Sequence, residues 1–227
     1  MIAIRKGREP HELAVYRQLP YSTYQNMHGA PTGRKNVDGS NETVYEAVLD
    51  KLIEEQGHLC AYCMRRIPEK RGLPRATIEH IIPQSKSDFQ KALDYGNMLA
   101  VCSGNRNALS DNDKTCDARR KNRRLDLNPL KPETLNGIEY KRDGTIFSAD
   151  QEIDKQLNDV LNLNCRSLQL ADCRKSALQT LIKEVQKKYP TGDIKEYCRK
   201  QLRLYEEQVQ YKTPYVGILI YWLEKHT

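Results

Sequence analysis

Two ionisable residues, Glu79 and His80, stand next to each other inside the otherwise apolar run TIEHIIPQS at positions 77–85. A carboxylate binds hard divalent cations such as Mg²⁺, and a neutral imidazole can take a proton from water. An unperturbed histidine is largely neutral at pH 7 and is therefore competent as a base. An isolated Glu-His pair is more often structural than catalytic, so the surrounding residues must decide between the two readings.

Four cysteines surround this pair. Cys60 and Cys63 have the two-residue spacing that lets two thiolates face one zinc ion, and Cys102 with Cys116 would complete a tetrahedral set. The long segment SGNRNALSDNDKT between Cys102 and Cys116 weakens the match to a two-knuckle pattern. A redox role for CAYC would need a helix start in a βαβ unit, and burial as small hydrophobic residues is the remaining alternative. We expect structural Zn²⁺, because the segment is otherwise poor in core residues.

These residues need elements that position them. Residues 1–57 are predicted to form a loop-like arm at 20–39, which covers either a partner or its own core, and an amphipathic helix over 40–57. Ser40 or Asn41 is the predicted N-cap and Gly57 the predicted stop. Residues 58–147 contain two predicted extended segments, 60–67 and 76–83, and a hairpin turning at Asp143-Gly144. Residues 148–227 show helical spacing, and the expected fold is therefore α+β and mainly helical.

The composition limits the classes of partner and location. The 227 residues carry a formal net charge of +7, which favours a polyanionic partner such as nucleic acid. The longest apolar run, 216–223, is far too short to span a bilayer, and the N-terminus does not have the pattern of a secretory signal. We therefore expect no membrane partner and a location in the bacterial cytoplasm, where seven cysteines are not expected to form a disulfide framework.

The order CAYC, Glu79-His80, Asn97, Cys102 and Cys116-Asp117 resembles the HNH endonuclease family. The resemblance implies a zinc-stapled ββα-metal finger between the arm with its helix and a C-terminal helical lobe. It also implies that His80 is the general base and that Glu79 binds Mg²⁺ or a similar divalent ion. The amide of Asn97 would brace the loop that orients His80, although an ordinary turn asparagine is the alternative.

The third catalytic position departs from the family pattern, because the second cysteine of the pair is displaced to Cys116. If Cys116 is the true partner, Asp117 is the remaining metal ligand. If the chain keeps the short spacing, Asn105 or Asn107 takes that role. Of these, we expect Asp117. The basic run that follows is either a solvated helix face or a surface for the nucleic-acid backbone, and its candidate contacts are Arg119, Arg120, Lys121, Arg123 and Arg124.

Further segments, an opening I-x-K-x-x-E-P-x-x-L and then NMLAVC, TCD and NPL, resemble the PtuB family of HNH subunits from Septu and retron-associated anti-phage systems. That resemblance implies a PtuA-like ATPase partner and, in retron systems, a reverse transcriptase with its multicopy single-stranded DNA. The expected function is metal-dependent cleavage of phosphodiester bonds in DNA, or in RNA such as tRNA, as the toxic effector of a defence complex. The alternative is a non-catalytic zinc-finger nucleic-acid-binding module, which needs the cysteines and the basic run but not Glu79, His80 or Asn97.

Overall fold

Helix α2 (Val44–Glu55) begins at a capping box. The Thr43 hydroxyl accepts a hydrogen bond from the backbone N–H of Glu46, and the Glu46 carboxylate accepts one from the backbone N–H of Thr43. The helix ends before Gly57, whose φ of 63° suits a glycine after a helix C-cap. The predicted stop is therefore confirmed. The predicted N-cap at Ser40 or Asn41 is wrong, because Asn41–Thr43 form a strand that leads into the helix.

The arm before α2 packs on the protein's own core. The 3₁₀ turn η1 (Asn26–His28) of the arm contacts α2, as does helix α1 (His11–Tyr16) before the arm, and Met27 in the turn is fully buried. Strand β1 (Pro31–Lys35) pairs antiparallel with β2 (Asn41–Thr43). The arm therefore contains more regular structure than its sequence indicates, because packing on α2 supplies the order that hydrophobic periodicity does not.

The central hairpin pairs β3 (Ala76–His80) with β4 (Met98–Cys102) in an antiparallel register that puts Glu79 opposite Leu99 and His80 opposite Met98. Helix α4 (Cys116–Arg120) packs against β4. The intervening chain forms short helical turns: η2 (Gln84–Lys86), α3 (Phe89–Ala92), η3 (Tyr95–Asn97) and η4 (Asp111–Asp113). The extended segment predicted at 76–83 is confirmed over β3.

The other predicted extended segment, 60–67, is wrong. This part of the chain is a tight turn, closed by a hydrogen bond from the N–H of Met64 to the carbonyl of Cys60, and only Leu59 and Arg66 form a β-bridge. A turn brings two side chains three positions apart to the same side, whereas consecutive residues of a strand alternate between faces. The spacing of the two cysteines therefore favours the turn.

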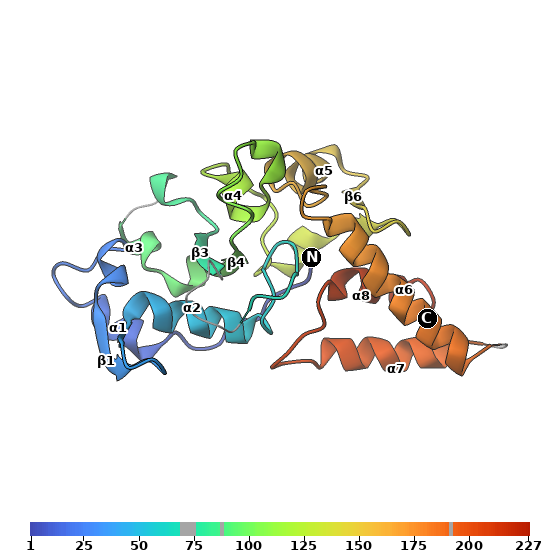
Figure 1. Cartoon of the computed structure of the whole chain (residues 1–227), viewed down its shortest axis with the longest axis horizontal. Helices are drawn as coiled ribbons and strands as arrows, with labels where there is room; N and C mark the ends of the chain where they lie inside the picture. The colour runs from blue at the N-terminus through green and yellow to red at the C-terminus, as the bar shows by residue number, and fades with distance from the viewer. Residues whose placement is uncertain (69–75, 87–88, 191–192) are drawn as a thin grey trace.

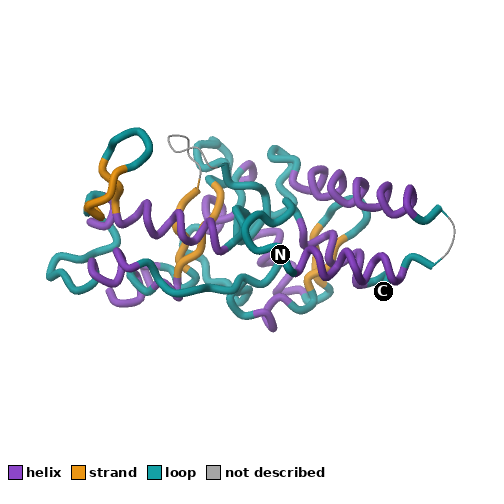
Figure 2. Tube along the Cα trace, turned by 90° about the horizontal axis from the view of Figure 1, so that it is seen from below, coloured by secondary structure: helices purple, strands orange, loops and turns teal. Residues whose placement is uncertain are grey.

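The C-terminal part is helical, as predicted. After η5 (Pro132–Leu135), strands β5 (Ile138–Tyr140) and β6 (Ile146–Ser148) form the predicted hairpin. The helical elements that follow are α5 (Gln151–Lys155), the π-turn η6 (Gln156–Val160), α6 (Leu170–Lys188), α7 (Lys195–Glu206) and α8 (Val216–Glu224). Helix α8 packs against both α6 and α7, and Figure 2 shows these long helices at one end of the molecule.

The computed structural model describes residues 1–68, 76–86, 89–190 and 193–227. In Figure 1 the arm and α2 lie at one end, α6, α7 and α8 at the other, and β3, β4 and α4 between them. The buried hydrophobic residues form one cluster that extends from Met1 to Leu223, so the three predicted regions share a core. Their division at 57 and 147 stays a prediction. Within the described ranges, no helix is both long and apolar enough to cross a membrane.

Candidate active site and cysteine cluster

Four buried cysteines lie together at the end of β4 in the central hairpin. The Sγ atoms of Cys60 and Cys116 are 3.7 Å apart, those of Cys63 and Cys102 are 3.7 Å apart, and those of Cys102 and Cys116 are 3.8 Å apart. Four sulfur atoms at about 2.3 Å from a tetrahedrally coordinated ion lie about 3.8 Å from one another. The four thiols therefore form a candidate metal site with the expected spacing, and in the described part of the chain no other group of His, Cys, Asp or Glu is clustered in this way.

The loop between Cys102 and Cys116 is held by the chain beyond α4. The backbone N–H of Cys116 donates to the carbonyl of Leu161 at 2.8 Å, and the hydroxyl of Thr115 donates to the same carbonyl at 2.9 Å. The amide of Asn162 donates to the carbonyl of Lys114 at 2.8 Å. These tertiary contacts return the chain to the cluster after a long insertion. Cys116 is therefore the fourth member, as predicted.

His80 is the last residue of β3, and two hydrogen bonds fix its ring. Its Nε2 atom lies 2.9 Å from the carbonyl oxygen of Ala92, and its Nδ1 atom lies 3.1 Å from the amide nitrogen of Gln84. A carbonyl oxygen only accepts, so Nε2 carries the hydrogen and Nδ1 presents the lone pair. Burial lowers the pKa of His80 from its usual value, which keeps the ring neutral at pH 7. The neutral ring, with its hydrogen on Nε2 and its lone pair on Nδ1, is thus in the form that a base requires.

Glu79 is buried beside His80 and is paired with a buried arginine. The guanidinium of Arg120 donates to the Glu79 carboxylate, and the Tyr62 hydroxyl donates to the same oxygen at 3.1 Å. Burial raises the pKa of Glu79 to about 8 against the opposing effect of Arg120, and the nearby carboxylate of Asp117 adds to the rise. A cation between the two carboxylates would relieve this repulsion.

A pocket of about 550 Å³ brings Glu79, His80 and Asp117 together. Asp117, in the first turn of α4, forms an ion pair with Arg106. The other two candidates for the third ligand do not line this pocket. Asn105 donates its amide to the carbonyl of Asp113 at 2.9 Å, and Asn107 is exposed on the loop. The geometry favours Asp117 over both.

Asn97 makes the bracing contacts expected of it. Its side-chain oxygen accepts the backbone N–H of Ile82 at 2.8 Å, and its amide donates to the carbonyls of Ile82 and Lys91 at 3.2 and 3.1 Å. These bonds join both ends of the loop that follows His80, including the end that leads to Ala92. Asn97 therefore braces the loop between His80 and Ala92, and it does not line the pocket.

The basic run after Asp117 is not one uniform surface. Arg120 is fully buried and cannot present its guanidinium to a phosphate. Arg123 donates to the carbonyls of Arg119, Arg120, Asp159 and Val160, so it ties the end of α4 to η6. Arg119 is half-buried and donates to the carbonyl of Asp159.

The two remaining residues of this run, Lys121 and Arg124, are exposed. Of all five basic residues, only Lys121 lines the pocket, where it also pairs with Asp111. We therefore remove Arg120 from the predicted nucleic-acid surface, because its guanidinium is directed into the protein.

Sequence reasoning missed several pocket residues. Arg106 pairs with Asp117, Gln84 contacts His80, and the rings of Tyr24, His28 and Tyr45 line the pocket from the arm and α2. The only signal for the aromatic residues is their frequency in the arm, which has no hydrophobic period. Their place in the site comes from tertiary packing.

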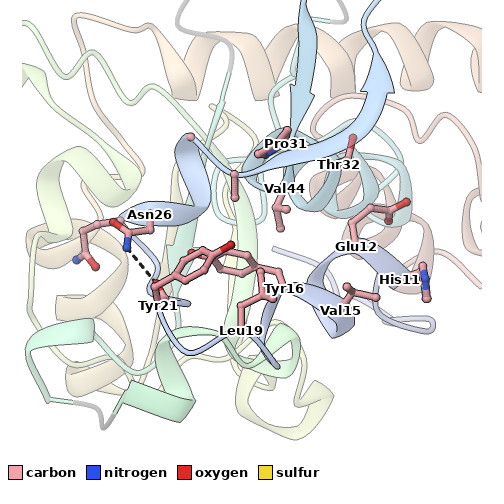
Figure 3. Close-up of a pocket in the computed structure, with 13 residues that line it drawn as sticks. His11, Glu12, Val15, Tyr16, Leu19, Tyr21, Asn26, Pro31, Thr32 and Val44 are labelled. Atoms are coloured by element: carbon pink, nitrogen blue, oxygen red, sulfur yellow. Dashed lines mark hydrogen bonds between the residues drawn. The ribbon is translucent and has the colours of Figure 1, made fainter.

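A separate pocket of about 740 Å³ lies on the arm (Figure 3). Its lining is mixed, with Val15, Leu19 and Tyr21 as exposed apolar members. Glu12 at its edge is paired with Arg34. None of the candidate catalytic residues lines it, so the pocket at His80 remains the candidate active site.

Two comparisons with known proteins bear on this site. A family model described as HNH endonuclease matches residues 60–104. This range contains Glu79, His80 and Asn97, together with three of the four clustered cysteines, Cys60, Cys63 and Cys102. A protein of Vibrio cholerae serotype O1 biovar El Tor, named "Retron Vc95 putative HNH endonuclease", is 30% identical over 149 residues, covering 61% of this chain and 67% of that protein. The chain, with its Glu79-His80 pocket, therefore belongs to the HNH endonuclease family.

Proposed function

We propose that this protein is a metal-dependent endonuclease that hydrolyses phosphodiester bonds in nucleic acid, with His80 as the general base. Membership of the HNH endonuclease family implies a nuclease. The observation that carries the proposal is the shared pocket of Glu79, His80 and Asp117, with the ring of His80 fixed by Ala92. A base must lie within hydrogen-bond reach of the proton that it removes, and Nδ1 is the ring nitrogen that the Ala92 carbonyl leaves with its lone pair.

The proton chemistry follows from the ring's hydrogen bonds. Because Nε2–H is held by the Ala92 carbonyl, Nδ1 is the atom that accepts the proton of the attacking water. The amide of Gln84 donates to Nδ1 in the structure and marks the position that such a water would take. After proton transfer, the imidazolium keeps its bond to Ala92, so the ring does not need to turn.

Glu79 and Asp117 are the residues that would hold Mg²⁺ or a similar divalent ion. Both offer hard oxygen ligands, and the Asp117 carboxylate disfavours the negative charge of Glu79. A bound ion would polarise a phosphate oxygen and stabilise the leaving 3′ oxygen. Arg120 and Tyr62 keep the Glu79 carboxylate at the edge of the pocket through their hydrogen bonds.

The four-cysteine cluster is proposed to bind structural zinc. Its all-sulfur donor set and its spacing fit zinc, and all four side chains are buried. The cluster joins the turn at 60–63, the end of β4 and the start of α4. A zinc ion there would hold Asp117 near Glu79, because Asp117 follows Cys116 directly.

A role in anti-phage defence is supported by the retron-associated relative. We propose that the chain is a PtuB-type effector that acts with a PtuA-like ATPase and, in a retron setting, with a reverse transcriptase and its multicopy single-stranded DNA. The motifs at the N-terminus, along β4 and after it that resemble the PtuB family support this assignment. The nuclease function does not depend on it.

The test compares wild type with His80→Ala, and uses His11→Ala as a matched histidine control outside the pocket. Each protein, with its ATPase partner, is incubated with plasmid, single-stranded DNA and RNA in Mg²⁺ or in EDTA. We expect Mg²⁺-dependent cleavage by wild type and His11→Ala, and none by His80→Ala. Binding without cleavage on every substrate would overturn the proposal in favour of a non-catalytic zinc-finger module.

A further inference from the structure

An aromatic cluster from the arm and α2 forms part of the pocket that contains His80. The rings of His28 and Tyr45 are stacked, with centroids 3.8 Å apart and planes at 23°. The ring of Tyr24 meets His28, Tyr45 and His80 edge-on, and its centroid is 4.6 Å from that of His80. All four rings line the pocket.

The stacked pair has one anchored ring and one exposed ring. The Tyr45 hydroxyl accepts the backbone N–H of Ile78 in β3 at 3.2 Å, which ties this ring to the strand that carries His80. His28 lies on top of it and is exposed to solvent. Partial desolvation of the ring lowers the pKa of His28, so the ring is neutral at pH 7 and offers an aromatic face instead of a charge.

The same pocket also contains two exposed cations, Arg106 and Lys121. A nucleic-acid strand carries phosphates along its backbone and flat bases beside them, so one pocket with cations and stacked rings matches both parts. In a duplex, the faces of each base are covered by its neighbours. An unpaired base has a free face that can stack on an aromatic side chain.

We infer that the His28–Tyr45 pair is a stacking platform for an unpaired nucleobase next to the scissile phosphate. The preferred substrate is then a single-stranded or looped segment of nucleic acid, and uninterrupted duplex is a poor one. This inference rests on the proposed nuclease function, because it places the base beside the phosphate that His80 would serve. It assigns His28 a role in substrate binding and none in proton transfer.

The test measures binding, so that it does not depend on turnover. His80→Ala protein is titrated against fluorescent DNA and RNA oligonucleotides of one sequence in single-stranded, hairpin-loop and duplex forms. We expect tighter binding to the unpaired forms, and the DNA and RNA arms show which sugar is preferred. Adding His28→Ala should weaken binding to unpaired strands by about 5-fold to 150-fold, the range for loss of one base–aromatic stack. His28→Phe should restore it.

An abasic scan then identifies the base that stacks. Removing one base at a time from the single strand should reveal a position where the loss weakens binding to the parent His80→Ala protein. The same loss should not weaken binding to the double variant that also carries His28→Ala. The dependence of affinity on salt should be the same in both proteins, because stacking releases no counterions. A smaller salt slope in His28→Ala would mean that His28 contacts phosphate and would overturn the inference.

Two results separate this inference from the nuclease proposal. Equal binding of duplex and unpaired strands, or no effect of His28→Ala at any abasic position, overturns the platform and leaves the nuclease proposal standing. Tight and His28-dependent binding of unpaired strands by a wild-type protein that cuts nothing in Mg²⁺ supports the platform but contradicts the nuclease proposal.

Discussion

The guanidinium of Arg120 and the carboxylate of Glu79 form an ion pair in the protein interior, with side chains 1% and 7% exposed. Arg120 also donates to the backbone carbonyls of His80 and Ile81 at 2.7 and 2.6 Å. One side chain of α4 therefore fixes the end of β3 and a proposed metal ligand together. The relative position of Glu79 and Asp117 depends on this link, because Asp117 belongs to the same short helix.

Replacing Arg120 with Met should destabilise the protein strongly. The substitution leaves the Glu79 carboxylate buried without its cation and removes the donor to the carbonyls of His80, Ile81 and Arg123. Breaking a buried ion pair in this way costs about 3–5 kcal/mol. We expect a loss of this size in the free energy of unfolding, measured by urea denaturation at a fixed metal concentration.

Arg124→Met is the matched control, because Arg124 belongs to the same basic run but is exposed. It should change the free energy of unfolding by less than about 0.5 kcal/mol. Equal effects of the two substitutions would contradict the structural role of Arg120. In the double variant Arg120→Met with Glu79→Gln, part of the stability should return, since no buried charge remains unpaired.

The basic run also shows where sequence reasoning failed. ARRKNRR was predicted to be a surface for nucleic acid, but Arg120 lies four positions after Cys116 on α4. Residues four apart share one helix face, and Cys116 is fully buried. If Cys116 is a buried zinc ligand, Arg120 on the same helix face must therefore face inward. The composition of the run does not predict a buried Arg120, because long charged side chains are seldom buried unless they are paired.

The parts of the site that sequence did indicate are close together in the chain. Cys60, Cys63, Glu79, His80 and Asn97 follow local patterns, and the structure brings all five to the central hairpin. The place of Asp117 does not follow from a local pattern, because Leu161 and Asn162, far along the chain, hold the residues that precede it. The sequence does not predict the aromatic cluster of Tyr24, His28 and Tyr45, because tertiary packing alone brings the arm to the pocket.

Cys116→Ser should remove the metal of the cysteine cluster. A serine hydroxyl is a poor substitute for a thiolate ligand, so a four-sulfur site loses a quarter of its donor set. We expect metal content by mass spectrometry to fall well below one zinc per chain. A loss of about 3 kcal/mol in stability would lower the melting temperature by about 6–12 °C. Cys173→Ser, in half-buried Cys173 on α6, should keep the metal. Full zinc content in Cys116→Ser would show that the cluster assignment, and with it Asp117, is wrong.

Asp117→Asn should reduce cleavage far more than Asn107→Ala. The first substitution removes a charged ligand from the pocket, whereas Asn107 is exposed and outside it. Outer partners of metal ligands typically contribute 10-fold to about 100-fold, so loss of a direct ligand should cost more than about 100-fold in kcat/KM. Raising the Mg²⁺ concentration should recover part of the activity of Asp117→Asn. A larger loss in Asn107→Ala would move the third ligand to the loop.

The pH dependence of cleavage should follow the neutral form of His80. A base works only when it is unprotonated. At saturating Mg²⁺, where the bound ion would keep Glu79 ionised, kcat/KM should therefore be constant above the pKa of His80 and fall about tenfold per pH unit below it. Burial lowers that pKa, so the midpoint of the fall should lie below 6.5, the usual histidine value. A midpoint above 6.5 in the wild-type protein would contradict the buried, neutral ring.

Gln84→Ala should move the acid limb of the pH profile, where kcat/KM falls as the pH is lowered, to higher pH. The amide of Gln84 donates to the Nδ1 lone pair, and only the neutral ring can accept that bond. Removing a hydrogen bond worth about 1 kcal/mol from the neutral form raises the pKa by about 0.7 unit. The exposed Gln18 provides the control variant Gln18→Ala, whose profile should match wild type. An acid limb that stays in place or moves to lower pH in Gln84→Ala would show that Nδ1 is not the nitrogen that takes the proton.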